Sequence, residues 1–406
     1  MKKLLCMVSL LSALISCKDE TQPELSEGVW RGKLSVMEGE KLPFNFLVER
    51  EDDAYKMQIY NASEVIVVDE IELKGDSIRI HPPVFEGYIS GTFTPERIEG
   101  DFRIESLDRV VPFEASFGET ERFSTKKNAD VNVSGIWETE FTPVDLEAYM
   151  GKGIFAQDGN KVTGTFRTTT GDYRYLEGVV TGDSLKLSAF DGAHAFLFTA
   201  QVTDSSLNGV FYSGNHSKET FVGKRNEGFE LPPADSLTFL KKGYDKFSFS
   251  FPDIDGTMVS SEDERFKNKV VIVQILGSWC PNCLDETKFY VNYLRDHNLK
   301  NLEVVGLAFE YAKTKEGAIK SIERLKQRIG VNYPILLAQY GSSDKDMAQK
   351  KLPMLNRLLS YPTTIFIDKE GKVRHIHTGF NGPATGEKYI EFHKEFDTLL
   401  HELLSE

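Results

Sequence analysis

The first half of the chain is made of short strand-like runs of apolar residues. Between residues 28 and 123, and again between residues 135 and 222, such runs are separated by Gly, Asp and Pro; residues 44–48 and 162–166 are examples. Short strands at close, regular spacing are typical of an all-β sandwich or barrel. We therefore predict two all-β modules, each a small antiparallel barrel or sandwich, over residues 27–125 and 131–226.

The two stretches also repeat one another. A Gly-x-Trp run at residues 28–30 returns at 135–137, and a Gly-Asp-Ser run at residues 75–80 returns at 182–187, both 107 residues later. A shared offset between separate landmarks indicates an internal duplication. The Gly-x-Trp start resembles the first strand of lipocalin-like barrels, but we expect both tryptophans to be core residues rather than parts of a ligand site.

The pattern changes after a linker at residues 227–242, which lacks periodicity and carries the pair Pro232-Pro233. From residue 243 to 406, strand-like runs alternate with helix-length segments, which predicts βαβ units on a largely parallel sheet. The strands are expected at residues 270–276, 302–309 and 335–338, with a hairpin formed by 364–367 and 373–377. The helices are expected at residues 283–295, 316–329, 344–359 with a break at Pro353, and 387–404.

The N-terminus has the pattern of a processing segment. Lys2 and Lys3 precede an apolar stretch at residues 4–15, which is too short to span a bilayer and suits a signal peptide. Leu14-Ile15-Ser16-Cys17 resembles the lipobox of bacterial lipoproteins, which implies that residues 1–17 are a signal peptide with Cys17 as the lipidated residue. Residues 18–20 resemble surface-export signals of Bacteroidetes-type lipoproteins, so the periplasmic face of the outer membrane and the cell surface both remain open.

The charge and the cysteine content of the chain argue against some functions and favour others. The formal net charge of −14 comes without a Lys/Arg cluster, which disfavours nucleic-acid binding. Of four cysteines, Cys6 would leave with the signal peptide and Cys17 would carry lipid. Cys280 and Cys283 are then the only thiols of the mature chain, so no structural disulfide framework is expected and this pair is available for exchange chemistry.

The pair lies in Trp279-Cys280-Pro281-Asn282-Cys283, between a predicted strand and a predicted helix. C-x-x-C at such a junction indicates thiol–disulfide chemistry. Cys280 is expected to be exposed and to precede the helix, with Pro281 at the first helical position. Its thiolate would attack a substrate disulfide and Cys283 would resolve the intermediate. A zinc site would need two further ligands, and the candidates His375 and His377 are expected to face solvent; we predict no metal and no cofactor besides the redox-active pair.

Residues from about 247 to the C-terminus resemble the TlpA/ResA-type thioredoxin-like disulfide reductases, in a lipoprotein form of Bacteroidetes-type bacteria. Five pieces in the family's order carry the resemblance: residues 251–256, 279–283, 307–310, 361–364 and 377–386. The resemblance implies a thioredoxin-like domain over residues 243–406 and a cis peptide bond before Pro362. It also implies a substrate groove formed by Trp279, Pro281, Tyr361, Pro362 and Thr363, and as partners extracytoplasmic protein disulfides and a membrane thiol-transfer electron donor.

The chain departs from ordinary thioredoxins in ways that bear on proton handling. Gln274 replaces the buried Asp that relays protons, and Glu310, at the end of a predicted strand, is our candidate acid–base partner. Asp285 and Glu286 are expected in the first helical turn, where they would oppose a thiolate at Cys280 and so favour a reductase over an oxidase or isomerase. An alternative function is a ligand- or protein-binding lipoprotein whose β-modules do the main work and whose redox domain is ancillary.

Overall fold

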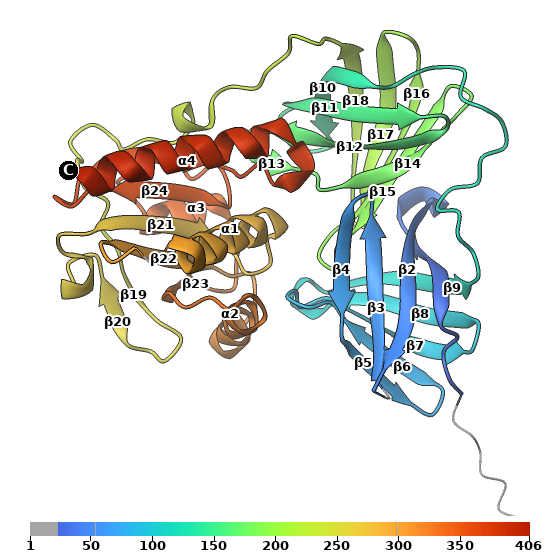
Figure 1. Ribbon diagram of the computed structural model, residues 1–406, viewed down its shortest axis with the longest axis horizontal. Coiled ribbons are helices and arrows are strands. Elements are labelled where there is room, and N and C mark those ends of the chain that lie inside the picture. The colour runs from blue at the N-terminus through green and yellow to red at the C-terminus, as the bar shows by residue number, and fades with distance from the viewer. Residues whose placement is uncertain (1–22, 53, 298) are drawn as a thin grey trace, which may run out of the picture.

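The computed structural model of the protein describes residues 23–52, 54–297 and 299–406 (Figure 1). The expected signal peptide, with Cys6 and Cys17, lies outside the described residues. Among the helices of the described part, none is long and apolar enough to cross a membrane.

The first β-module is one antiparallel sheet in the order β4-β3-β2-β1-β9-β8-β7-β6-β5. Its two edge strands, β4 and β5, follow each other in the chain with one residue between them, so the sheet curls into a barrel that stays unpaired along this seam. The strands are β1 (Gly28–Ser35), β2 (Lys41–Glu51), β3 (Ala54–Asn61), β4 (Glu64–Val68), β5 (Glu70–Lys74), β6 (Ser77–His81), β7 (Tyr88–Thr94), β8 (Arg97–Ile104) and β9 (Arg109–Phe117).

The second β-module closes on itself. Its ring of antiparallel pairs runs β10-β11-β12-β14-β15-β16-β17-β18 and back to β10, with the two-residue β13 attached to β12. Closure leaves no open sheet edge in this ring. The strands are β10 (Gly135–Pro143), β11 (Tyr149–Asp158), β12 (Lys161–Thr168), β13 (Gly171–Asp172), β14 (Leu176–Thr181), β15 (Ser184–Phe190), β16 (Ala195–Val202), β17 (Ser206–Ser213) and β18 (Ser217–Arg225).

The two modules share details at the landmarks that suggested a duplication. Trp30 and Trp137 both lie on the first strand of their module and are fully buried, as expected for core residues. Each indole N–H donates to the backbone carbonyl four residues earlier, at 3.0 and 2.8 Å. Gly75 and Gly182 have φ of 62° and 63° in the corresponding turns, a conformation that glycine adopts without steric cost. The repeated geometry supports two copies of one unit.

The C-terminal domain has a central sheet in the order β23-β22-β21-β24-β25. Strands β21, β22 and β23 are parallel, β24 is antiparallel to β21, and β25 is antiparallel to β24. Every residue of β21 is buried, which fits its uninterrupted apolar sequence. The elements are β19 (Ser250–Pro252), β20 (Met258–Ser260), β21 (Val270–Leu276), α1 (Pro281–His297), β22 (Leu302–Phe309), α2 (Lys315–Ile329), β23 (Ile335–Gln339), α3 (Lys345–Lys351), β24 (Thr363–Ile367), β25 (Val373–Thr378) and α4 (Glu387–Ser405).

One expected helix is wrong in its second half. The segment at residues 344–359 is helical only over α3, which ends at Lys351. Pro353 disfavours helical geometry at Leu352, whose φ and ψ are −125° and 61°. The following residues instead hydrogen-bond to the linker: Lys241 N–H donates to Met354 O at 2.8 Å. Residues 353–359 therefore form turns and irregular chain that tie the linker to the C-terminal domain.

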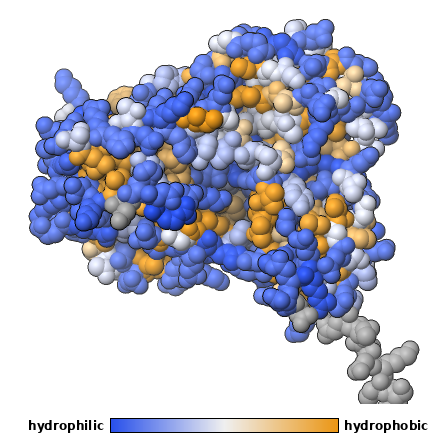
Figure 2. Space-filling view, viewed as in Figure 1, coloured by the Kyte–Doolittle hydropathy of each residue, from blue (hydrophilic) through white to orange (hydrophobic). Residues whose placement is uncertain are grey.

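The C-terminal domain packs directly against both β-modules, and the start of α1 faces them (Figure 1). Val84 and Phe85, from the first module, belong to the hydrophobic cluster of the C-terminal domain. Beside them, Arg324 on α2 pairs with Glu70 at 3.0 Å. On the face shown in Figure 2, hydrophobic groups form separate patches within a mostly hydrophilic surface. The active-site motif therefore lies where three packed units meet.

Candidate active site

The two cysteines form a dithiol at the start of α1. Cys280 precedes the helix and Pro281 is its first residue, as predicted. The Cys280 Sγ accepts the backbone N–H of Cys283 at 3.2 Å, so the sulfur takes the role of a helix-capping acceptor. A thiolate at this position is stabilised by the N–H group and by the helix dipole. The geometry suits Cys280 as the nucleophile and Cys283 as the resolving thiol.

The expected exposure of Cys280 is wrong. Cys280 is 6% exposed and Cys283 1%, so both thiols are buried. The position of Cys280 at the helix start is as predicted, but its sulfur packs against Tyr361 O and the Cys283 N–H. Burial raises the pKa of Cys283 well above its ordinary value, with further contributions from the neighbouring Cys280. Cys283 is therefore held as a thiol.

The predicted groove residues gather around Cys280. The peptide bond between Tyr361 and Pro362 is cis, as expected. The carbonyl of Tyr361 lies 3.4 Å from the Cys280 Sγ, and the Trp279 and Tyr361 rings meet edge to face with centroids 5.6 Å apart. Thr363 is fully buried, with its hydroxyl donated to Ser360 O at 2.8 Å. Thr363 thus lies beneath the groove and supports its floor.

Glu310 lies beside the loop that leads into the motif. It follows β22, is 1% exposed, and accepts the backbone N–H of Ser278 at 2.8 Å and the Ser278 hydroxyl at 2.7 Å. Burial raises the pKa of Glu310 to about 7. A carboxyl that changes protonation near neutral pH fits an acid–base role, and that role stays a prediction.

A second buried carboxyl, Glu286, was missed by sequence reasoning. Glu286 lies three residues after Cys283, on the side of α1 that faces Gln274 of β21, so helical spacing could have found it. Its Oε2 accepts Gln274 Nε2 at 2.8 Å, and its Oε1 accepts the hydroxyls of Thr364 at 2.8 Å and Tyr290 at 3.1 Å. Burial raises the pKa of Glu286 to about 7, and its charge adds to the raised pKa of Cys283.

Asp285 and Glu286 do not lie in the first turn of α1, where they were expected. Because α1 begins at Pro281, both residues lie in its second turn. Asp285 forms an ion pair with Arg174 of the second β-module, whose side chain is 5% exposed. The negative charge of Asp285 is thus compensated by another domain, which local sequence cannot reveal. The expected first-turn position is therefore wrong, and the expected opposition to a Cys280 thiolate stays a prediction for Glu286.

The two histidines considered as metal ligands do not face solvent. His375 and His377 are half-buried and line a cavity of about 370 Å³ between the linker, β25 and α4. Burial lowers the pKa of His377 to about 3, so its ring is neutral.

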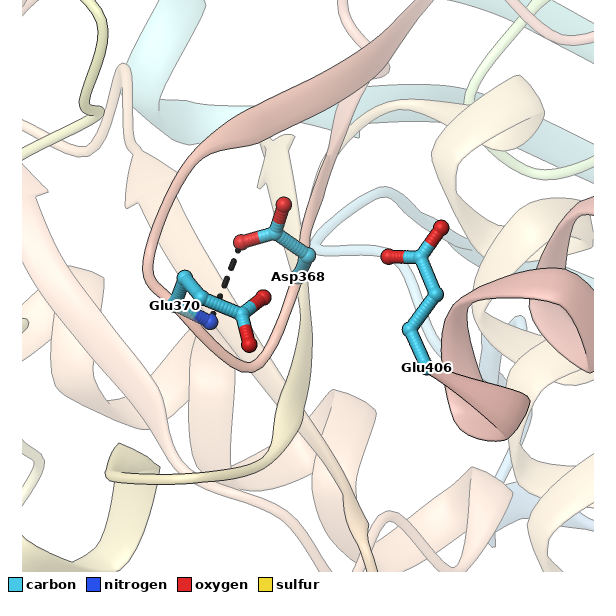
Figure 3. A group of neighbouring side chains, drawn as sticks. All are labelled: Asp368, Glu370 and Glu406. Atoms are coloured by element: carbon cyan, nitrogen blue, oxygen red, sulfur yellow. Dashed lines mark hydrogen bonds between the residues drawn. The ribbon is translucent and has the colours of Figure 1, made fainter.

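A separate group of three carboxylates, Asp368, Glu370 and Glu406, is the candidate metal-binding cluster of the described residues (Figure 3). Asp368 Oδ1 already accepts the Glu370 N–H at 3.1 Å, and Arg374 pairs with Glu406 at 2.5 Å and with Asp368 at 3.5 Å. Arg374 thus supplies the positive charge that these side chains need. The chemistry of this cluster does not call for a metal ion.

Residues 243–390 match the family model described as Redoxin. The match covers 148 of the 406 residues and lies within the C-terminal domain. Among curated proteins, the chain is 24% identical over 161 residues to the thiol-disulfide oxidoreductase ResA of Bacillus subtilis (strain 168), covering 39% of this chain and 79% of that protein. It is 26% identical over 141 residues to the thioredoxin-like protein YneN of the same organism, covering 34% of this chain and 73% of that protein.

A solved structure of a thiol-disulfide oxidoreductase from Bacteroides fragilis NCTC 9343 aligns at 19% identity and a TM-score of 0.28, over 37% of this chain and 99% of that chain. The family match and the curated relatives identify the C-terminal domain as that of a thiol–disulfide oxidoreductase.

Proposed function

We propose that the protein is a lipid-anchored, extracytoplasmic disulfide reductase that acts on protein disulfides through Cys280 and Cys283. One observation carries the proposal: the Cys280 sulfur accepts the Cys283 N–H at 3.2 Å and lies 3.4 Å from the carbonyl before the cis proline. This arrangement brings a nucleophilic sulfur, a resolving thiol and the backbone before the cis proline together in one place.

The reaction is a pair of exchanges in which electrons balance. The Cys280 thiolate attacks one sulfur of the substrate disulfide, and the other sulfur leaves as a thiolate that takes up a proton. The Cys283 thiol then loses its proton and attacks Cys280, which releases the reduced substrate and leaves a Cys280–Cys283 disulfide. A membrane thiol-transfer protein returns two electrons and two protons to restart the cycle.

Glu286 is the group best supported as the proton acceptor for Cys283. Its pKa of about 7 lets it change protonation near neutral pH, and its charge acts on the Cys283 thiol. Glu310, with a similar pKa, lies against the loop before Cys280 and would act on the first exchange. Two carboxyls on separate elements would thus serve the two cysteines.

The anchored location rests on the sequence of residues 1–17, which resembles a lipoprotein signal peptide. Lipid at Cys17 would hold the dithiol at an extracytoplasmic membrane surface, in reach of a membrane electron donor. Labelling of the exported protein with a radioactive fatty acid tests this part. Loss of label in a Cys17→Ala variant is the expected result, and label that persists in this variant would contradict it.

The reductase assignment is tested by trapping. A Cys283→Ser variant cannot complete the second exchange, so it should accumulate mixed disulfides with its substrates through Cys280, whereas a Cys280→Ser variant should not. The reduction potential of the pair sets the direction: a value near about −270 mV fits a reductase and one near about −120 mV fits an oxidase. Equal trapping by both variants would refute the assigned roles of the cysteines.

The interior of the second β-module argues for a structural role rather than the alternative ligand-binding function. Four fully buried phenylalanines, Phe141, Phe166, Phe198 and Phe221, fill its barrel and pack on each other at centroid distances of 4.9 to 6.4 Å. A barrel of this size is typically filled by side chains. We propose that the modules position the redox domain and control access to it.

A further inference from the structure

The second β-module reaches over the active site with residues 168–174, which we call the cover segment. The segment follows β12, includes β13 and ends at Arg174. It contacts the C-terminal domain inside the C-x-x-C motif, where Asn282 Nδ2 donates to Asp172 O at 3.3 Å. It also contacts the loop before the cis proline, where the Ser360 hydroxyl donates to Thr170 O at 2.8 Å. One short segment thus contacts the chain neighbours of Pro281 and Tyr361, two residues of the predicted substrate groove.

The cover segment and the C-terminal domain fit closely, and each has a glycine at the contact. A Cβ at Gly171 would lie 2.0 Å from Asn282 Nδ2, and φ at this residue is +139°. On the opposite surface, a Cβ at Gly379 would lie 2.9 Å from the carbonyl carbon of Thr170, and φ is +75°. An added Cβ at Gly379 would meet the backbone of Thr170, and one at Gly171 would displace the Asn282 side chain and press on Phe380 O at 3.1 Å, so either change loosens the contact of the cover segment with the active-site surface.

The cover segment is held by buried polar groups. Asp172 Oδ2 accepts the backbone N–H of Gly382 at 2.6 Å. Arg174 forms ion pairs with Asp285 on α1 and with Glu64 at 2.5 Å on the first β-module, and its Nε lies 3.7 Å from Asp191. If the cover segment moves away from the C-terminal domain, water can solvate the charges that are paired in this structure. The contact can therefore break without exposing a large apolar area.

The repeat itself shows that this segment is specialised. At the offset of 107 residues, β4 of the first module corresponds to residues 171–175 of the second. In the first module this stretch is a five-residue strand paired with β3. In the second module it is reduced to the two-residue β13 and turns toward the C-terminal domain. The two copies thus differ at the place where one of them meets the redox motif.

We infer that the cover segment is a removable lid on the active-site groove, so that a protein disulfide reaches Cys280 only after the second β-module has moved away. The inference rests on the proposed function, because the groove is assigned from the thiol–disulfide chemistry. An incoming chain would need the surface around Asn282 and Ser360 that the cover segment occupies, and the nearby Cys280 is only 6% exposed. Small disulfides meet less of this obstruction than folded proteins.

Two maleimides of different size test the lid in the full chain. Cys280 is labelled either with N-ethylmaleimide or with a maleimide attached to a small folded protein that lacks cysteine, and mass spectrometry of the peptides gives the rate at Cys280. The same chemistry occurs in both reactions, so the ratio of the large-reagent rate to the small-reagent rate reports steric access and cancels changes in thiolate content. Neither measurement requires the dithiol to reduce a disulfide.

Gly171→Ala should raise this ratio by about tenfold or more, because the open state of a two-state equilibrium is commonly a minor population. Gly159→Ala is the matched control: Gly159 also has positive φ (+58°) and lies in the same module, but a Cβ there meets nothing within 4 Å. If Gly171→Ala does not fold, Gly379→Ala acts from the opposite surface, with Gly371→Ala (φ +81°, also without neighbours) as its control.

A ratio that stays at the wild-type value in folded Gly171→Ala and Gly379→Ala would overturn the lid. A ratio that rises equally in the control variants would also overturn it, because general loosening would then explain the access. Failure of the proposed function looks different: the labelling ratio would rise as expected, while reduced wild-type and variant chains would both fail to exchange with disulfides.

Discussion

The buried carboxyl of Glu286 should make the free energy of unfolding depend on pH. Its pKa is raised from 4.5 to about 7 by burial. A carboxyl whose pKa is higher in the folded than in the unfolded state binds more protons when folded at intermediate pH, so the free energy of unfolding falls as pH rises from about 4.5 to about 7. A difference of this size corresponds to about 3 kcal/mol.

Glu286→Gln removes this titration while keeping the hydrogen-bonding capacity of the site. The carboxamide oxygen can accept from Gln274 Nε2, and its NH₂ can donate to the hydroxyls of Thr364 and Tyr290, which rotate to accept. At about pH 4 the variant and the wild type should differ only by the quality of these bonds. Above about pH 8 the variant should gain about 3 kcal/mol relative to the wild type, since the wild type then carries a buried charge.

The assay must follow the C-terminal domain alone. In a Cys280→Ser background, Cys283 is 1% exposed, so a short pulse of methyl methanethiosulfonate at each urea concentration measures the fraction of molecules in which this domain is open. Exposed Glu323 on α2 provides the control, because Glu323→Gln leaves its side chain in water. A stability difference between Glu286→Gln and its parent that does not change with pH would refute the reasoning.

Three further changes have expected outcomes. Glu310→Gln should flatten the pH dependence of Cys280 alkylation near pH 7, where Glu310 titrates; a profile identical to the wild type would remove Glu310 from the proton chemistry. Arg174→Met should lower the free energy of unfolding by about 3–5 kcal/mol in urea titrations, because it leaves buried carboxylates unpaired, whereas Arg97→Met, at an exposed pair, should change it by less than about 1 kcal/mol. Phe198→Ala should lower the free energy of unfolding by about 3–5 kcal/mol, because it leaves a cavity in the second barrel. Val222→Ala, at an exposed strand position, is the control. An equally small loss of stability in both variants would show that the barrel relaxes to fill the cavity.

The central elements of the redox domain could be predicted from the chain because their residues encode them locally. The strands at Val270–Leu276 and Leu302–Phe309 have the expected bounds, since continuous apolar runs are typical of buried parallel strands. Helix α1 begins where Pro281 fits a first helical turn. The expected helix beyond Leu352 failed because the linker, distant in sequence, takes the backbone hydrogen bonds of that stretch.

The environment of the cysteines could be predicted only in part, because it is built by contacts between domains. The pairing of Cys280 with Cys283 and the cis bond before Pro362 follow from the motif and the family resemblance. The contact between Asn282 and Asp172 joins residues more than 100 positions apart in the chain, so local sequence does not reveal it. Glu286 could have been found by helical spacing, but its burial required knowledge of which face of α1 meets β21.

Val84 and Phe85 carry a consequence for how the chain folds. These two side chains from the first β-module complete the hydrophobic cluster of the C-terminal domain. N-terminal units generally fold first as a chain emerges from the ribosome. The first module would then already present the hydrophobic surface of Val84 and Phe85 when the C-terminal domain folds against it. The C-terminal segment expressed by itself would lack this hydrophobic surface and Arg174, the ion-pair partner of Asp285. We therefore expect the isolated C-terminal segment to be less stable than the same segment in the full chain.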